Sequence, residues 1–288
     1  MLYLAIVSLL WAFSFGLIGS ALVGVDSFVV ATLRLAAASL LFLPFLRPKL
    51  IRTSDCLGLF IYGAIQFGLM YVCYMKAFQY LPSHLVALFS ILTPLYVVVI
   101  HDIRKGQFSP RYLLAALLSV CGAATIKVQG LPTGDFWLGF SLMQVAGIAF
   151  AFGQITYRDW KRSQPQIKDA SVFAWLTLGG TVCAGLFSFF FANTSALVIS
   201  SAQWQSILYL GLVASGLGFF LWNKGATQTN PGTLAAFNNA VVPLAMLFSL
   251  FIFGEINQVS KEALIRLLIG GLLIASAVTL AARSKAVR

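Results

Sequence analysis

Four polar side chains stand close to prolines inside apolar stretches, where hydrogen-bonding groups need partners. They are Ser90, Thr93, Asn238 and Asn239. Each lies within about one helical turn of Pro94 or Pro243. A buried hydroxyl or amide is costly unless a neighbouring helix, water or a ligand bonds it. We therefore expect these groups to line a ligand-binding cavity, although contacts between helices would also satisfy them.

Arg34 is the one full charge well inside an apolar run, residues 28–46. A charge at that depth faces the interior of a helix bundle or extends toward the membrane surface. A guanidinium can hold a substrate carboxylate through two parallel hydrogen bonds. It can equally bind carbonyl groups of neighbouring helices, so Arg34 has either a binding role or a structural one.

Six further side chains complete the predicted substrate-binding set. They are Trp11, Ser14, Gln66, Tyr71, Tyr74 and Trp175. The two Trp rings stand beside small or polar residues, a setting suited to stacking on an apolar or aromatic ligand. Core packing for the rings, and helix–helix hydrogen bonds for the polar groups, are the alternatives.

Catalysis is not expected from this sequence. The apolar runs hold no carboxylate pair, histidine cluster or metal-ligand spacing, so an intramembrane enzyme is disfavoured, and we predict no catalytic residue, metal or cofactor. All eight acids fall in predicted connections or at the ends of the predicted helices. His84 and Lys76, each near a helix end, are then the titrating groups that could still carry a proton. Transfer of a solute without an intramembrane proton relay, by facilitated diffusion or exchange, is the expectation.

The elements that must position these residues are membrane helices. Of 288 residues, 60% are hydrophobic and 9% charged, far from the composition of a soluble domain. About 20 apolar residues span a bilayer as a helix. Ten such runs are predicted, at residues 2–23, 28–46, 56–78, 85–100, 112–126, 136–157, 170–192, 204–222, 234–253 and 264–282.

An internal repeat organises these ten runs. Residues 77–95, AFQYLPSHLVALFSILTPL, align with residues 226–244, ATQTNPGTLAAFNNAVVPL, with seven identities at a shift of 149 positions. An odd number of helices in each copy inverts the second copy, as in many secondary transporters. We predict an all-α integral membrane protein of two inverted-topology five-helix repeats, residues 1–130 and 131–288. Pro94 and Pro243 are expected to be paired hinges in opposite helices around one cavity.

The net charge of +11 carries information on orientation. Most of the 19 Lys and Arg residues fall in alternate connections, which with the positive-inside rule places both termini in the cytoplasm. Nucleic acid binding is therefore not expected. The four cysteines are dispersed through apolar runs and are expected to be packing residues.

The sequence resembles the EamA-type members of the drug/metabolite transporter superfamily over nearly its full length. The resemblance rests on Trp11, Arg34, the two helix prolines, Gly254–Glu255 after the ninth run, and glycines such as Gly122 and Gly271 in the fifth and tenth. It implies a central cavity made mainly by the third, fourth, eighth and ninth helices. Because the family carries an Arg at this place across varied substrates, the resemblance favours a structural role for Arg34.

One position departs from the family pattern. The Gly-Glu pair expected after the fourth helix is replaced by Arg104, Lys105 and Gly106. We expect the loss of one corner contact and no loss of transport.

The expected function is transport of a small metabolite across the inner membrane by alternating access. An amino acid or its derivative, exported, is the first candidate implied by the resemblance. Uptake of another metabolite or a vitamin, and a lipid-linked flippase of the same fold, are the alternatives. The expected partners are a small-molecule substrate and membrane lipid, with the protein a monomer or homodimer.

Overall fold

The computed structural model describes residues 1–22, 24–81, 86, 89–127, 136–193, 198–244, 247 and 261–283. Within these ranges the regular structure is helical only. The main helices are α1 Leu2–Ala21, α2 Ser27–Phe42, α3 Thr53–Gly63, α4 Met70–Ala77, α6 Thr93–Lys105, α7 Pro110–Lys127, α8 Phe136–Ser163, α9 Phe173–Phe191, α10 Ser201–Tyr209, α11 Gly218–Thr227, α12 Pro231–Asn238 and α14 Lys261–Arg283. The expectation of an all-helical chain is confirmed for the described residues.

Two of the long helical rods carry a π-helical segment in their middle. The segment η3, Ala64–Leu69, joins α3 to α4, and η7, Leu210–Leu217, joins α10 to α11. A shift of 149 positions carries η3 onto residues 213–218, so the two segments overlap in the repeat frame. A π-helical segment changes the direction of the following side chains and is frequent at functional sites.

Both repeat prolines stand where a helix is interrupted. A 3₁₀ turn, η4 Ser90–Leu92, precedes α6, and Pro94 is the second residue of that helix. The first N–H groups of a helix have no partner within it, so the missing N–H of Pro94 costs no helical hydrogen bond. In the second copy α12 ends at Asn238, and the amides of Asn239 and Ala240 donate to carbonyls three residues earlier. Helical structure resumes at residues 241–244, which include Pro243. The prolines therefore begin new helical segments, where the sequence predicted bends inside continuous helices.

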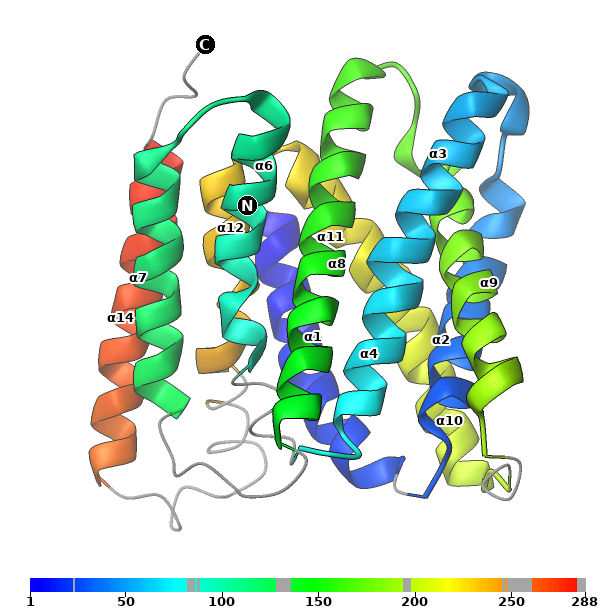
Figure 1. Cartoon of the computed structure of the whole chain (residues 1–288), viewed down its shortest axis with the longest axis horizontal. Helices are drawn as coiled ribbons and strands as arrows, with labels where there is room; N and C mark the ends of the chain where they lie inside the picture. The colour runs from blue at the N-terminus through cyan, green and yellow to red at the C-terminus, as the bar shows by residue number, and fades with distance from the viewer. Residues whose placement is uncertain are drawn as a thin grey trace.

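The helices form one bundle with their axes roughly aligned (Figure 1). On one side α7 packs on α14, and on the other α9 packs on α2 and α3, with α6, α8, α11 and α12 between them. The contact between α3 and α9 is close because a glycine of each helix faces the backbone of the other helix. A Cβ placed on Gly63 falls 1.9 Å from the Leu176 carbonyl oxygen, and one placed on Gly179 falls 1.9 Å from that of Phe60.

Six helical stretches are long and apolar enough to cross a membrane. They are Ser27–Phe45, Thr53–Ala77, Phe136–Ser163, Phe173–Phe191, Ser201–Thr227 and Ile265–Arg283. Leu2–Ser14 and Pro110–Thr125 are shorter apolar helices. The chain is thus a multi-span membrane protein, and its two-repeat, ten-helix organisation is taken up below as a proposal.

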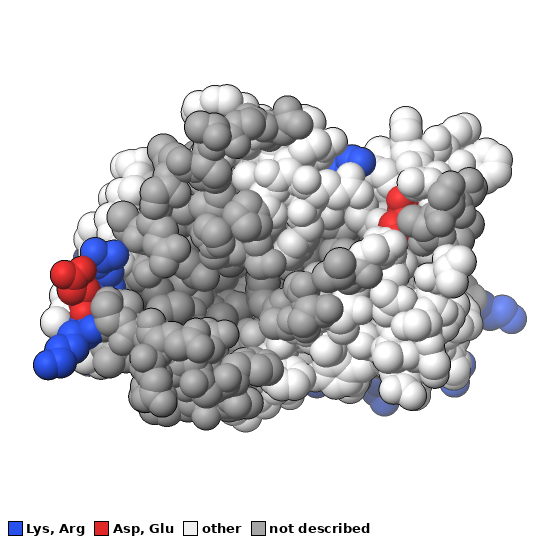
Figure 2. All heavy atoms as spheres, turned by 90° about the horizontal axis from the view of Figure 1, so that it is seen from below, with Lys and Arg blue, Asp and Glu red and all other residues white. Residues whose placement is uncertain are grey.

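The two ends of the bundle differ in charge. The start of α3, the loop from α6 to α7 and the end of α8 lie together at the upper end of Figure 1, and these segments carry basic residues. Seen from the lower end, the described atoms show few charged side chains (Figure 2). Asp159 lies inside α8 and Asp102 inside α6, because both helices extend beyond their predicted ends.

Candidate functional site

A chain of polar contacts crosses the bundle interior from Arg34. Its Nη2 donates to the Tyr71 hydroxyl at 2.6 Å, and that hydroxyl lies 3.0 Å from the Ser215 Oγ. The Ser215 Oγ donates to the Leu210 carbonyl, five residues back, within the π-helical segment. Helices α2, α4 and the η7 segment each supply one of these side chains. Two of them come from the first half of the sequence and one from the second.

The Arg34 guanidinium is buried and only partly bonded. The side chain is 2% exposed, and its Nε and Nη1 have no hydrogen-bond partner. The ion pairs of the described residues do not include Arg34. Its Cζ lies 4.6 Å from the Tyr71 ring centroid, a cation–π contact that stabilises the charge in part.

A second polar contact joins the two π-containing rods. Gln66 Nε2 donates to Asn223 Oδ1 at 2.8 Å, and Asn223 Nδ2 donates back to Gln66 Oε1 at 3.3 Å. Both amides are fully buried. The 149-residue shift relates Gln66 to Ser215 and Tyr74 to Asn223, so this pair matches the Tyr71–Ser215 contact to within one helical turn. The Gln66–Asn223 and Tyr71–Ser215 contacts thus occupy nearly equivalent positions in the repeat frame.

Aromatic rings centred on Phe219 fill the space between these polar groups. Phe67 stacks on Phe219 with centroids 4.3 Å apart, and Tyr71 and Trp11 lie at 5.5 and 5.7 Å. Trp11 also lies 4.9 Å from the Trp222 ring. The result is an aromatic cluster that contacts Arg34 through Tyr71 and continues to the amides through Trp222.

Trp222 connects the cluster to a further amide. Its Nε1 donates to Gln154 Oε1 at 2.9 Å, while Gln154 Nε2 has no partner. Trp11 Nε1 donates to the Ala214 carbonyl in the second π-helical segment. Gln154 and Arg34 therefore each carry N–H groups without a partner next to the aromatic cluster.

The structure brings together five of the predicted side chains and separates the others. Trp11, Arg34, Gln66, Tyr71 and Tyr74 lie in or against the aromatic cluster. Ser14 donates to the Leu10 carbonyl of its own helix, and Trp175 packs at the edge of the surrounding core with its Nε1 unpaired.

The proline-associated side chains form a separate group around the helix breaks. Thr93 Oγ1 donates to the Ser90 carbonyl at 2.7 Å, and Asn238 Nδ2 donates to the Leu234 carbonyl. Asn239 is fully buried, and its Nδ2 donates to Ile91 O and Ser119 Oγ. These contacts hold the breaks together. His84 and Gly254–Glu255 lie outside the described residues.

Five participants went unpredicted: Phe67, Ser215, Phe219, Trp222 and Asn223. The repeat frame contained a signal for two of them, because it maps Gln66 onto Ser215 and Tyr74 onto Asn223. The three aromatic residues, Phe67, Phe219 and Trp222, stand in apolar runs where no sequence pattern separates a lining ring from a lipid-facing one.

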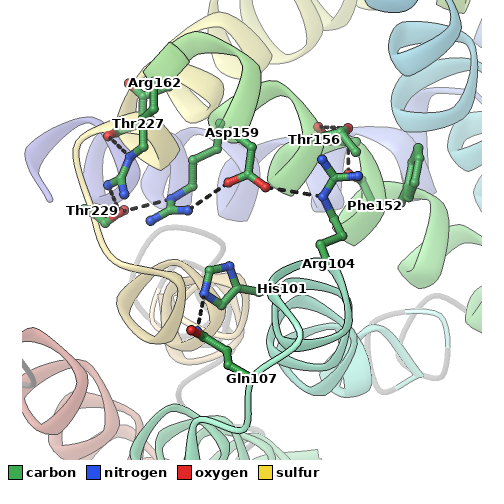
Figure 3. Close-up of polar contacts among 11 residues, drawn as sticks. His101, Arg104, Gln107, Phe152, Thr156, Asp159, Arg162, Thr227 and Thr229 are labelled. Atoms are coloured by element: carbon green, nitrogen blue, oxygen red, sulfur yellow. Dashed lines mark hydrogen bonds and ion pairs between the residues drawn. The ribbon is translucent and has the colours of Figure 1, made fainter. Parts of the chain in front are cut away.

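A charged cluster lies at the upper end of the bundle, and Figure 3 shows its contacts. Arg104 of α6 forms an ion pair with Asp159 of α8 at 3.3 Å, and Arg158 contacts the same carboxylate at 3.3 Å. Arg158 and Arg162 also donate to the Thr229 carbonyl, and Arg162 to that of Thr227. We call these three arginines, with Asp159, the upper-end cluster.

The residues that replace the family's Gly-Glu corner are part of this arrangement. Gly106 ends α6 in the left-handed conformation, with φ of 60°. Arg104 reaches α8 instead of leaving the corner empty. The expectation of a simply lost contact is replaced by a different contact between α6 and α8.

Comparison with known proteins identifies relatives over nearly the full length. A 38% identical protein of Pseudomonas aeruginosa, named a probable biotin transporter, aligns over 266 residues, 92% of this chain and 93% of that one. The biotin transporter of Escherichia coli K12 is 39% identical over 258 residues, 88% and 85% of the two chains. An uncharacterised transporter of Bacillus subtilis, YetK, is 23% identical over 206 residues, 70% and 62%. None of these names supports amino-acid export, the first candidate from sequence.

A solved structure and a family model agree with the relationship to transporters. A solved structure with 18% sequence identity superposes with a TM-score of 0.77 and covers 98% of both chains, so the fold is shared. The model of the EamA-like transporter family matches residues 1–128 and 133–277. The chain therefore belongs to the EamA-like transporter family, within the drug/metabolite transporter superfamily.

Proposed function

We propose that this protein takes up biotin or a closely related vitamin across the inner membrane. The observation that carries the proposal is the 38–39% identity, over 85% or more of both chains, to proteins named for biotin transport. This replaces amino-acid export with the vitamin-uptake alternative.

The interior chemistry is compatible with such a ligand. Biotin combines a fused ureido ring with an apolar thioether ring and an acidic chain. Rings such as Phe219 and Trp222 offer stacking surface for the apolar part. The amides of Gln66, Asn223 and Gln154 are both donors and acceptors, as a ureido group requires.

Alternating access is the proposed mechanism. Two inverted repeats, residues 1–130 and 131–288, enclose the aromatic cluster and open it to one face at a time. Overlapping π-helical segments and two proline-associated breaks at corresponding positions support the pseudo-symmetry. In this mechanism the breaks before Pro94 and Pro243 are the hinges.

The upper-end cluster is the proposed closure on the cytoplasmic side. It joins α6 of the first repeat to α8 of the second through Arg104 and Asp159. Opening toward the cytoplasm requires this ion pair and the arginine contacts to the Thr227 and Thr229 carbonyls to separate. Basic residues at this end support a cytoplasmic location for it and for both termini, by the positive-inside rule.

Uptake of labelled biotin by purified protein in proteoliposomes tests the function. We expect saturable uptake that excess unlabelled biotin competes away and that amino acids do not. A pH gradient is expected to change the rate little, because the described spans hold no acid at mid-depth. Inserted protein that transports an amino acid but not biotin contradicts the proposal.

A further inference from the structure

We propose that Arg34 is the anchor for the ligand's carboxylate, an inference that rests on the proposed function. The starting observation is a cation buried to 2% exposure with two of its three guanidinium nitrogens unbonded. An uncompensated buried charge is costly, and more so inside a membrane. An anion that arrives with the substrate supplies the missing partner.

The surroundings of Arg34 orient the guanidinium without neutralising it. The one hydrogen bond goes to the Tyr71 hydroxyl, whose own contact with Ser215 holds it in place. Neither hydroxyl supplies a negative charge, so among the described residues the positive charge has only the partial stabilisation of its cation–π contact with the Tyr71 ring. At the upper end, by contrast, Arg158 and Arg162 donate to backbone carbonyls. Arg34 Nε and Nη1 donate to none.

The arrangement also specifies the class of ligand. Phe219 contacts Tyr71 on one side and Trp11 on the other, and Trp11 leads to Trp222 beside Asn223. Ser215 and Asn223 are eight residues apart on one continuous rod, about 12 Å at 1.5 Å per residue. A ligand that uses both ends is an elongated monocarboxylate with an apolar middle and a polar, uncharged head. We assign the carboxylate to Arg34 and the head to the Gln66–Asn223 amides.

The π-helical segments explain how these donors come to face the ligand. Ser215 lies within η7 and donates five residues back, a geometry that an α-helix does not provide. Gln66 lies at the corresponding place within η3. The repeat therefore delivers one polar group from each half to opposite ends of the same aromatic cluster.

The test compares biotin with its neutral carboxamide in wild-type protein and in Arg34→Gln. We expect the wild type to favour the acid and Arg34→Gln to lose acid uptake about tenfold or more while carboxamide uptake is retained. A change of this kind corresponds to about 1.4 kcal/mol or more of lost recognition. Arg34→Lys, which keeps the charge but not the planar fork, is expected to retain part of the preference. Arg47→Gln, at an exposed arginine, is the matched control and keeps the wild-type ratio.

The outcomes distinguish failure of the Arg34 anchor from failure of the proposed function. Equal loss of both compounds in Arg34→Gln, with normal insertion and unchanged thermal stability, refutes the anchor and leaves biotin transport standing. Equal loss together with reduced stability assigns Arg34 a structural role and also refutes it. Failure of the wild type to bind or carry either compound refutes the proposed function, and the anchor with it.

Discussion

Asn239 donates a hydrogen bond to the carbonyl oxygen of Ile91 at 3.0 Å, and this contact joins the two helix breaks of the molecule. Ile91 lies in the 3₁₀ turn before α6, and Asn239 directly follows α12. The break before Pro94 removes regular helical bonding, so carbonyls there need other donors. The Thr93 hydroxyl serves Ser90, and Asn239 serves Ile91. A side chain at the second break thus supplies a donor to the first.

Replacing Asn239 with Leu should therefore destabilise the protein. The change leaves Ile91 O and Ser119 Oγ without their donor, at a cost of about 1–3 kcal/mol for each buried group left unpaired. We expect a lower unfolding temperature in detergent and slower transport, with normal membrane insertion.

Asn238→Leu is the matched control for that change. Asn238 is half-buried, and within the described structure its side chain bonds only the Leu234 carbonyl of its own helix. Its replacement should lower the unfolding temperature clearly less. Equal effects of the two substitutions would mean that the bond between the breaks contributes nothing.

The Gln66–Asn223 pair should show strong coupling in a double-mutant cycle. Gln66→Leu or Asn223→Leu alone leaves the remaining buried amide unpaired, whereas the double substitution removes both polar groups. We expect the double variant to be less destabilised than the sum of the singles by about 1–3 kcal/mol. Unfolding free energies measured in one detergent provide the cycle. Additivity to within about 0.5 kcal/mol contradicts a direct contact.

Opening of the upper end should become easier when Asp159 loses its charge. Asp159→Asn weakens contacts with both Arg104 and Arg158, whereas Arg104→Gln removes only one pair, whose arginine is 37% exposed. An exposed pair contributes about 0.2–1 kcal/mol, so Arg104→Gln should shift the open fraction by no more than a few-fold. Maleimide labelling of Thr156→Cys, a buried position on α8, measures that fraction once the four native cysteines are replaced by serine.

The order of labelling rates distinguishes this closure from general loosening. Asp159→Asn should label fastest, then Arg104→Gln, with Lys105→Gln at the background rate because its exposed charge has no ion-pair partner in the described structure. Faster labelling in Lys105→Gln than in Arg104→Gln would contradict the proposal that the upper-end cluster is a closure.

Sequence reasoning recovered the features that repeat or that stand out by charge. The 149-residue frame located both proline-associated breaks, and Arg34 was conspicuous as a charge within an apolar run. The frame did not show that Ser90 and Asn239 belong to a group separate from Arg34. The number of residues between a side chain and a proline does not show where in the bundle that side chain points. The π-helical segments were also missed, since one extra residue per turn leaves no mark in composition.

The positions of glycine contacts were equally hidden in the sequence, and they give a sharp test of the fold. Gly271 pairs with Gly122 in the repeat frame, yet a Cβ placed on Gly271 meets nothing within 4 Å. At Gly63 the same atom falls 1.9 Å from the Leu176 carbonyl oxygen. Gly63→Ala should force α3 and α9 apart and lower stability by at least about 1–3 kcal/mol. Gly271→Ala should leave stability unchanged or raise it slightly, because alanine favours the helix. Thermal unfolding of both variants checks the pair, and a greater loss for Gly271→Ala contradicts the packing of α3 against α9 described above.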